Sequence, residues 1–142
     1  MSPDIVDVDH VAIRVTDLEE ALAFYHELLG MPVRDRDRYE NGEVPYVAVV
    51  AGSRHVHLVP TDESTIDPDR NDVPVGGDHL CLLVRSDDVD ARDQLSDLLS
   101  EIEAAGYAVE PGEPKKRYGA YGRDWAAYVR DPDGRRVEIK IH

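Results

Sequence analysis

The first regular stretch of the chain is a run of alternating residues, VDHVAIRV, at positions 8–15. One side of the alternation holds Val11, Ile13 and Val15, and the other holds His10, Ala12 and Arg14. A period of two predicts a strand with one face toward a core. The stretch GDHLCLLV at residues 77–84 repeats the pattern, with His79 in the place of His10. We therefore expect two equivalent strands, each with a histidine at its start.

A helix and three short strands are predicted to follow the first of these strands. Apolar residues recur at helical spacing in residues 16–30, and Thr16 with Glu19 matches a capping box at the start of the helix. The strand candidates, separated by turn residues, are residues 33–39, 46–52 and 55–61. The predicted unit is thus one strand, one helix and three strands.

The same order of elements recurs in the second half of the chain. A strand is predicted at residues 78–84, a helix at 87–106, an irregular strand region at 107–119 and two further strands at 124–131 and 135–142. This repeat indicates an internal duplication. We expect a first module at about residues 5–62, a polar connector at about 63–76 and a second module at about 77–142. Together they are expected to form a single domain over residues 1–142, within the usual size of about 100 to 200 residues.

The chain is strongly acidic, with 30 Asp and Glu against 16 Lys and Arg and a formal net charge of −14. A negative field of this size repels phosphate backbones and anionic lipids, so neither nucleic acid nor a membrane is expected as a partner. Only three of the basic residues are lysines. An acidic, arginine-preferring composition is typical of halophilic proteins, in which salt screens the self-repulsion. An ordinary acidic protein is the alternative.

The single cysteine, Cys81, excludes an intrachain disulfide and a CxxC site. The first ten residues lack the basic and apolar regions of a secretion signal, and no run of about 18 apolar residues occurs. We therefore expect a soluble cytoplasmic protein.

Four side chains of metal-binding type are predicted to share one side of the two sheets. They lie opposite the apolar positions of their strands, and they are His10, His57, His79 and Glu138. If the helices cover the apolar faces, all four face the hollow side. Imidazole and carboxylate groups suit Ni, Co, Zn, Mn or Fe(II), and two histidines with one carboxylate form a recurring catalytic set. A hydrogen-bonded structural role is the alternative for each histidine.

Several other residues have two interpretations each. Arg14 either binds a substrate carboxylate or pairs with a nearby aspartate. His55 is an alternative ligand if the strand register differs, and otherwise is exposed. Cys81 shares the face of His79 and either approaches the metal or, as we expect, is a small buried hydrophobic residue. His142, the last residue, is expected to fray. Residues 115–124, KKRYGAYGRD, are either a lid over an anionic substrate or a solvated loop.

Two segments carry a resemblance to a known family, DHVAIRVTDLEEALAFYHELLGMPV near the start of the chain and DPDGRRVEI near its end. They resemble the signature segments of the vicinal oxygen chelate superfamily, which includes glyoxalase I, extradiol dioxygenases, fosfomycin-modifying enzymes and bleomycin-binding proteins. The resemblance implies an α+β fold in which two βαβββ modules form curved mixed sheets around a central metal cavity. It also implies one divalent metal ion per site, held by His10, His57, His79 and Glu138.

The motif is most similar to that of bacterial glyoxalase I. That resemblance implies that Arg14 helps to hold a substrate, and that Glu138 both binds the metal and moves a proton. The chain departs from glyoxalase I at His57, where that family carries a glutamate, so only Glu138 remains as a carboxylate at a matched position.

A metal-dependent lyase or isomerase is therefore expected, acting on a small oxygenated substrate or its thiol adduct through a metal-stabilised enolate. One alternative is an Fe(II) extradiol-type dioxygenase with His10, His79 and Glu138 as its ligands, and another is a fosfomycin-modifying enzyme. A third is a non-catalytic binding protein of the bleomycin-resistance type. The resemblance also favours a homodimer.

Overall fold

The computed structural model describes residues 4, 8–61, 79–87 and 89–142. The chain divides into two compact units, Met1–Ser64 and Thr65–His142. The predicted connector at residues 63–76 lies outside the described residues. In the described part of the chain, no helix has both the length and the apolar composition needed to cross a membrane.

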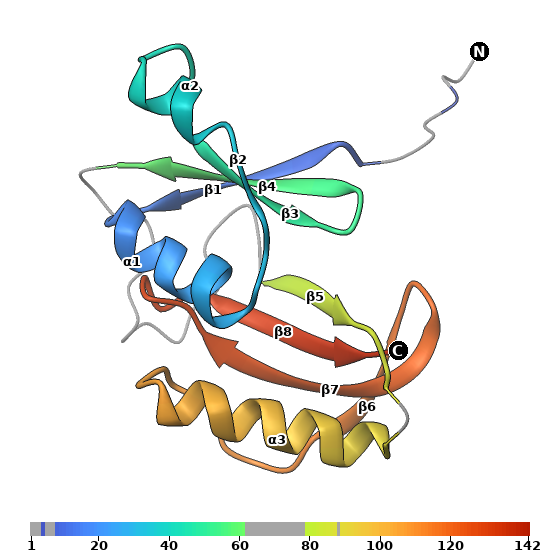
Figure 1. The fold of residues 1–142 in the computed structure, drawn as a ribbon. Helices are drawn as coiled ribbons and strands as arrows, with labels where there is room; N and C mark the ends of the chain where they lie inside the picture. Colours follow the sequence, from blue (N-terminus) through green and yellow to red (C-terminus); the bar gives the residue numbers. More distant parts are fainter. Residues whose placement is uncertain (1–3, 5–7, 62–78, 88) are drawn as a thin grey trace. The chain divides into compact units, whose positions relative to one another are not determined.

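The first unit is a four-stranded mixed sheet with short helices (Figure 1). Its elements are β1 (His10–Val15), α1 (Leu18–Leu22), the π-helix η1 (Ala23–Leu28), β2 (Val33–Arg34), α2 (Arg36–Glu40), β3 (Val47–Ala51) and β4 (Arg54–Pro60). The strand order is β1-β4-β3-β2. Strand β1 runs parallel to β4, and the other neighbours are antiparallel.

The second unit repeats this topology. Its elements are β5 (Leu80–Val84), α3 (Ala91–Ala104), β6 (Lys115–Gly119), β7 (Gly122–Arg130) and β8 (Arg136–Ile141). The strand order is β5-β8-β7-β6, and β5 again runs parallel to the last strand of its unit. The predicted α+β fold with two equivalent modules is confirmed.

The core of each unit lies between one sheet face and the helix that follows the first strand. In the first unit α1 and η1 bury Leu22, Phe24 and Tyr25, and the sheet buries Val49 and Leu58. Full burial of one such side chain contributes about 1.5 to 3 kcal/mol to folding. The helix begins at Asp17, whose carboxylate accepts a hydrogen bond from the N–H of Glu20, so the predicted Thr16 cap is wrong by one residue.

In the second unit α3 contacts β7 and β8 (Figure 1). The fully buried residues are Leu95 and Ile102 on the helix and Val129, Val137 and Ile139 on the sheet. Because side chains alternate along a strand, the opposite face of β8 carries Glu138 and Lys140. Both are buried, with 5% and 4% of their surfaces exposed. The predicted polar face of β8 therefore exists, and it is desolvated.

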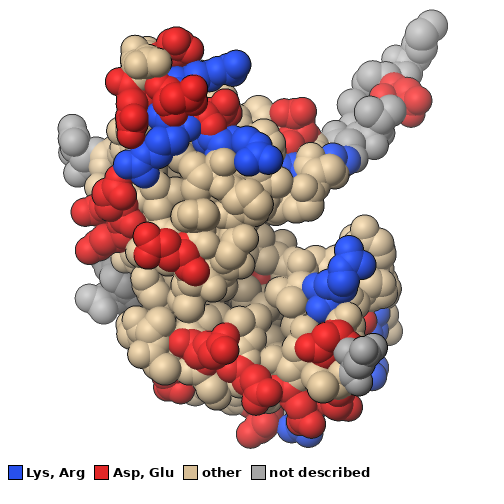
Figure 2. All heavy atoms as spheres, viewed as in Figure 1, with Lys and Arg blue, Asp and Glu red and all other residues tan. Residues whose placement is uncertain are grey.

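The exposed side of α3 is acidic. Figure 2 shows Asp and Glu side chains gathered over this helix, and its exposed acidic residues are Asp93, Asp97, Glu101 and Glu103. Water and counterions reach these carboxylates, so they add to the negative field without the desolvation that buried charges suffer. The composition predicted an acidic surface, and α3 is one element that carries it.

The strand predicted at residues 33–39 is wrong. Only Val33 and Arg34 pair with β3, and the following residues form α2. Asp35 has a φ of 64°, which turns the chain out of the strand. The Arg36 guanidinium then pairs with Glu40 one helical turn later and with Glu19. The segment has almost no apolar side chains to cover a sheet, so these local contacts decide its conformation.

The prediction that His142 frays is also wrong. Its backbone N–H donates to the carbonyl of Val84 at 2.9 Å, and its Nδ1 lies 3.1 Å from Oδ2 of Asp124. The ring also stacks on Tyr121. Pairing with β5 therefore continues to the last residue of the chain.

Candidate active site

Three aromatic rings stack at one face of the first module. The His57 ring lies between two others, with centroid distances of 3.8 Å to Tyr46 and 4.1 Å to His10 and interplanar angles of 7° and 13°. The strand register explains the contact, because Ala12 is the Cα partner of His57 and leaves room for a ring beside it. Two of the predicted ligands, His10 and His57, are thus brought together.

A neighbouring carboxylate orients the His10 ring. Its Nδ1 lies 2.8 Å from Oδ2 of Asp9, and this hydrogen bond lowers the pKa of the Asp9 carboxyl group. Metal-binding histidines commonly use one ring nitrogen for such a bond and the other for the metal. With Nδ1 engaged by Asp9, the Nε2 atom of His10 is the one left for a ligand.

The surroundings of His57 favour its neutral imidazole. Desolvation lowers its pKa below the ordinary value, and the charges of His10 and His55 lower it further. A neutral imidazole is the form that binds a metal. His55, the alternative ligand, is the register partner of His10, but its ring centroid lies 6.2 Å from that of His57. It is half-buried and not exposed as predicted.

The second module brings together the other two predicted ligands. Nε2 of His79 lies 2.8 Å from Oε2 of Glu138, and their side chains are 26% and 7% exposed. The edge of the His79 ring also meets the Tyr128 ring, with the centroids 5.2 Å apart. These contacts follow from the topology, because β5 and β7 both pair with β8 and leave Glu138 between Cys81 and Tyr128.

Cys81 differs from its prediction. The residue is exposed, so it is not a buried hydrophobic side chain. Partial desolvation of the sulfur, together with the Glu138 carboxylate, raises the pKa of the Cys81 thiol to about 11. The thiol therefore stays protonated at neutral pH, and it is not suited to attack a substrate as a free thiolate.

Within each module the described residues supply two of the four predicted ligands. No third His, Cys, Asp or Glu side chain in the described ranges joins either pair in an arrangement that could hold a metal ion. Arg14 is exposed on β1, and its role in holding a substrate remains a prediction. Residues 115–124 form the β6–β7 hairpin, in which Tyr118 and Tyr121 are exposed.

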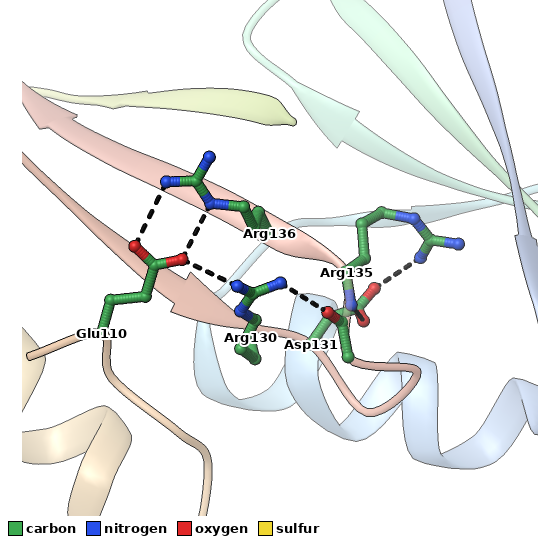
Figure 3. A network of polar contacts seen from close by, with 6 residues as sticks. Glu110, Arg130, Asp131, Arg135 and Arg136 are labelled. Carbon is green, nitrogen blue, oxygen red and sulfur yellow. Dashed lines mark hydrogen bonds and ion pairs between the residues drawn. The ribbon is translucent and has the colours of Figure 1, made fainter. Parts of the chain in front are cut away.

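A network of ion pairs holds β8, the strand that carries Glu138, against β7 (Figure 3). The sequence analysis did not predict this network. The Glu110 carboxylate accepts hydrogen bonds from Arg136 at 2.8 and 3.2 Å and from Arg130 at 2.9 Å. Arg136 begins β8, so this carboxylate ties the start of that strand to the end of β7. In the sequence, this network is indicated only by the two arginines at the ends of the turn. Their acceptor, Glu110, lies 26 residues from Arg136, so no local pattern links them.

The β7–β8 turn is held by the second part of this network (Figure 3). Oδ1 of Asp131 accepts hydrogen bonds from the backbone N–H groups of Asp133 and Arg135, and Oδ2 pairs with the Arg135 guanidinium. Asp131 is 4% exposed. This one carboxylate therefore satisfies three donors and sets where β8 begins.

We expect Asp131→Ala to lower the free energy of unfolding by about 2 to 4 kcal/mol, since it leaves the Arg135 guanidinium and two N–H groups without their acceptor. Chemical denaturation of the variant measures this value. The matched control is Asp97→Ala on the exposed side of α3, which we expect to change stability by less than about 0.5 kcal/mol. Equal stability of the two variants would contradict the role assigned to Asp131.

Comparison with known proteins connects this geometry to a family. The sequence model of the Glyoxalase/Bleomycin resistance protein/Dioxygenase superfamily matches residues 7–139. A probable lactoylglutathione lyase from Synechocystis is 30% identical over 130 residues, which cover 92% of this chain and 91% of that protein. A virulence protein from Salmonella typhimurium is 29% identical over 136 residues, covering 95% of this chain and 84% of the relative.

Solved structures show the same fold. The crystal structure of the Salmonella virulence protein matches with a TM-score of 0.66 and 26% identity, over 99% of both chains. A glyoxalase/dioxygenase from Nostoc punctiforme matches with a TM-score of 0.76 over 99% of this chain and 94% of the other, at 20% identity. The second match concerns the fold alone. Both cover essentially the whole sequence, so the similarity includes the two modules and not only one of them.

Proposed function

Since the chain belongs to the Glyoxalase/Bleomycin resistance protein/Dioxygenase superfamily, we propose that it is a divalent-metal enzyme of the glyoxalase type. Its reaction would be that of a lyase or isomerase on a small oxygenated compound or its thiol adduct. The observation that supports this most directly is the contact between His79 and the buried carboxylate of Glu138. Relatives named lactoylglutathione lyase support the same reaction class.

The donor groups fit a divalent metal. Imidazole nitrogens and one carboxylate are borderline ligands that suit Ni, Co, Zn, Mn or Fe(II). The hydrogen bond from Asp9 to His10 is the type of contact that orients a ligating histidine, and the lowered pKa of His57 favours its neutral form. We propose His10, His57, His79 and Glu138 as the ligands. A bound divalent ion would act as a Lewis acid that stabilises negative charge developing on a substrate oxygen.

Glu138 is proposed as the group that moves the proton. Its carboxylate is buried, so a proton taken from a substrate carbon would be held on oxygen out of contact with bulk water. The protonated Cys81 thiol beside it does not compete as a base, because its pKa is about 11. Arg14, exposed on the same face of β1 as His10, is proposed to pair with a substrate carboxylate through two of its guanidinium N–H groups.

Metal content tests the proposal first. We expect protein purified without a metal-affinity tag to bind about one divalent ion per site after reloading with Ni, Co, Zn, Mn or Fe, as measured by elemental analysis. A stoichiometry near zero with all five metals would favour a non-catalytic binding protein of the bleomycin-resistance type.

Formation of lactoylglutathione by the loaded protein then tests the reaction. Oxygen uptake with catechols, after anaerobic loading with iron, tests the dioxygenase alternative. Oxygen uptake without lactoylglutathione formation would replace the lyase proposal with that alternative.

A further inference from the structure

Two cations of the second module have no acidic partner among the described residues. Lys140 is only 4% exposed, and its ammonium group donates one hydrogen bond, to the backbone carbonyl of Arg117 at 2.9 Å. Among the described residues, no carboxylate forms an ion pair with either Lys140 or Arg117. This is unusual in a chain with 30 acidic residues, because buried charges in proteins are normally paired.

One nitrogen of the Arg117 side chain also lacks a partner among the described residues. Its Nε is fully buried and, within the part of the chain that is described, has no hydrogen-bond acceptor. The guanidinium lies over the Tyr128 ring, 5.0 Å from the centroid. Arg136 lies over the same ring at 3.9 Å, but the Glu110 carboxylate neutralises it. Among the described residues, Arg117 therefore differs from Arg136, because no carboxylate pairs with its guanidinium group.

Strand register places these cations on the face that carries Glu138. Ala126 pairs with both Lys140 on β8 and Lys115 on β6, and alternation along β6 puts Arg117 on the same face as Lys115. On β7 the same face carries Asp124, the register partner of Arg117, whose Oδ2 lies 3.1 Å from Nδ1 of His142. On β8 the acid next to Lys140 is Glu138, two residues earlier. Its Oε2 is already in contact with His79. A buried ammonium group and a buried guanidinium nitrogen thus face the same side of the sheet with unused donors.

We propose that Lys140 and Arg117 form a binding site for an oxyanion, the carboxylate or phosphate group of a small molecule. An oxyanion accepts several N–H donors at once, and charge-assisted hydrogen bonds strengthen where water is excluded. The overall charge of −14 repels anions, so local cations are needed to bind one. That the bound anion belongs to the substrate rests on the proposed function. Binding of an anion at this site requires no metal.

The test uses the full chain, stripped of metal with a chelator, and titrates acetate and inorganic phosphate separately at constant ionic strength. The readout is the side-chain Nε–H resonance of Arg117, identified by its loss in Arg117→Gln. We expect a saturable shift of this resonance with at least one of the two anions. Lys140→Met should weaken binding at least about tenfold, because it removes a buried positive charge beside the anion.

Arg123→Gln is the matched control, since Arg123 lies on the same hairpin but alternates to the other face, where it stacks on Tyr118. This variant loses one positive charge, as Arg117→Gln does, and should bind within about twofold of the wild type. Circular dichroism checks that the variants fold. Should Lys140→Met unfold, isothermal titration of Arg117→Gln against Arg123→Gln makes the same comparison.

Binding of phosphate but not acetate supports the site and assigns it to phosphate compounds, and the converse assigns it to carboxylates. No saturable shift with either anion, or equal weakening in the Arg123 control, would overturn the proposal. Saturable anion binding by a protein that takes up no metal would leave the oxyanion site standing and reject the metal enzyme. Metal uptake without saturable anion binding would reject the oxyanion site and leave the metal enzyme standing.

Discussion

Glu138→Gln is expected to lower turnover by about 10²- to 10⁴-fold, the range for loss of a general acid–base group. The Michaelis constant should change far less. Gln keeps the volume of the side chain, so the packing of the buried position is preserved. It loses the negative charge and the ability to accept a proton at neutral pH. An interaction needed only in the transition state lowers turnover in this way when it is removed.

The measurement is steady-state kinetics of lactoylglutathione formation at saturating metal, with bound metal quantified in the same sample. Saturating metal matters because a proposed ligand is being changed. Glu113→Gln is the control, since the Glu113 side chain is 80% exposed and pairs with Arg92 away from the proposed site. Normal turnover in Glu138→Gln with metal bound would remove Glu138 from the mechanism.

His57→Ala should weaken metal binding by at least about 100-fold, whereas His55→Ala should change it by less than about threefold. The two residues lie on the same strand and the same face, so they form a matched pair. His57 occupies the position that the family resemblance assigns to a ligand, and its ring lies beside that of His10, with the centroids 4.1 Å apart. Its lowered pKa also favours the neutral form at pH 7.

Competition with a metal-binding dye measures both affinities. Far-ultraviolet circular dichroism controls for the loss of stacking on Tyr46, because an unfolded variant also loses metal. If the folded His55→Ala variant loses the metal and His57→Ala retains it, then the ligand is His55 and not His57. The same titration thus separates the two assignments that strand register left open.

The comparison with glyoxalase I turns on this position. Glyoxalase I carries a glutamate where this chain has His57, and a second carboxylate would offer a second proton acceptor. In this chain the ring of His57 lies between those of Tyr46 and His10, so it is packed against both and does not extend freely into solvent. Activity of the wild type that is lost in Glu138→Gln would therefore show that one carboxylate is enough for the reaction.

The alternation of side chains along β4 and β8 could be predicted from the sequence, whereas on β1 only Val15 of the predicted core face is buried and Val11 is 42% exposed. It has one physical cause, the period of two in an extended chain, and it requires no knowledge of partners. That periodicity placed Glu138 opposite Val137 and Ile139, and the buried apolar face of β8 agrees. The duplicated order of elements was predictable for the same reason, because each module repeats its local pattern.

Segments whose conformation depends on local charges or distant partners could not be predicted in this way. Residues 33–39 have the composition of a strand only at Val33, and the Arg36–Glu40 and Arg36–Glu19 pairs stabilise a helix instead. His142 is the last residue, but hydrogen bonds to Val84 and Asp124 hold it in place. Both partners lie far from His142 in the sequence, so no local sequence pattern predicts these contacts.

The sequence by itself determined the family, the two modules and the strand faces on which the proposed ligands lie, because these depend on periodicity and on motifs contiguous in the chain. Tertiary structure decided which side chains meet. Lys140 reaches the carbonyl of Arg117, 23 residues away, only because β7 lies between β6 and β8. The burial of Lys140, which has no counterion among the described residues, arises in the same way, since desolvation depends on neighbours that strand order brings together and not on residues adjacent in the chain.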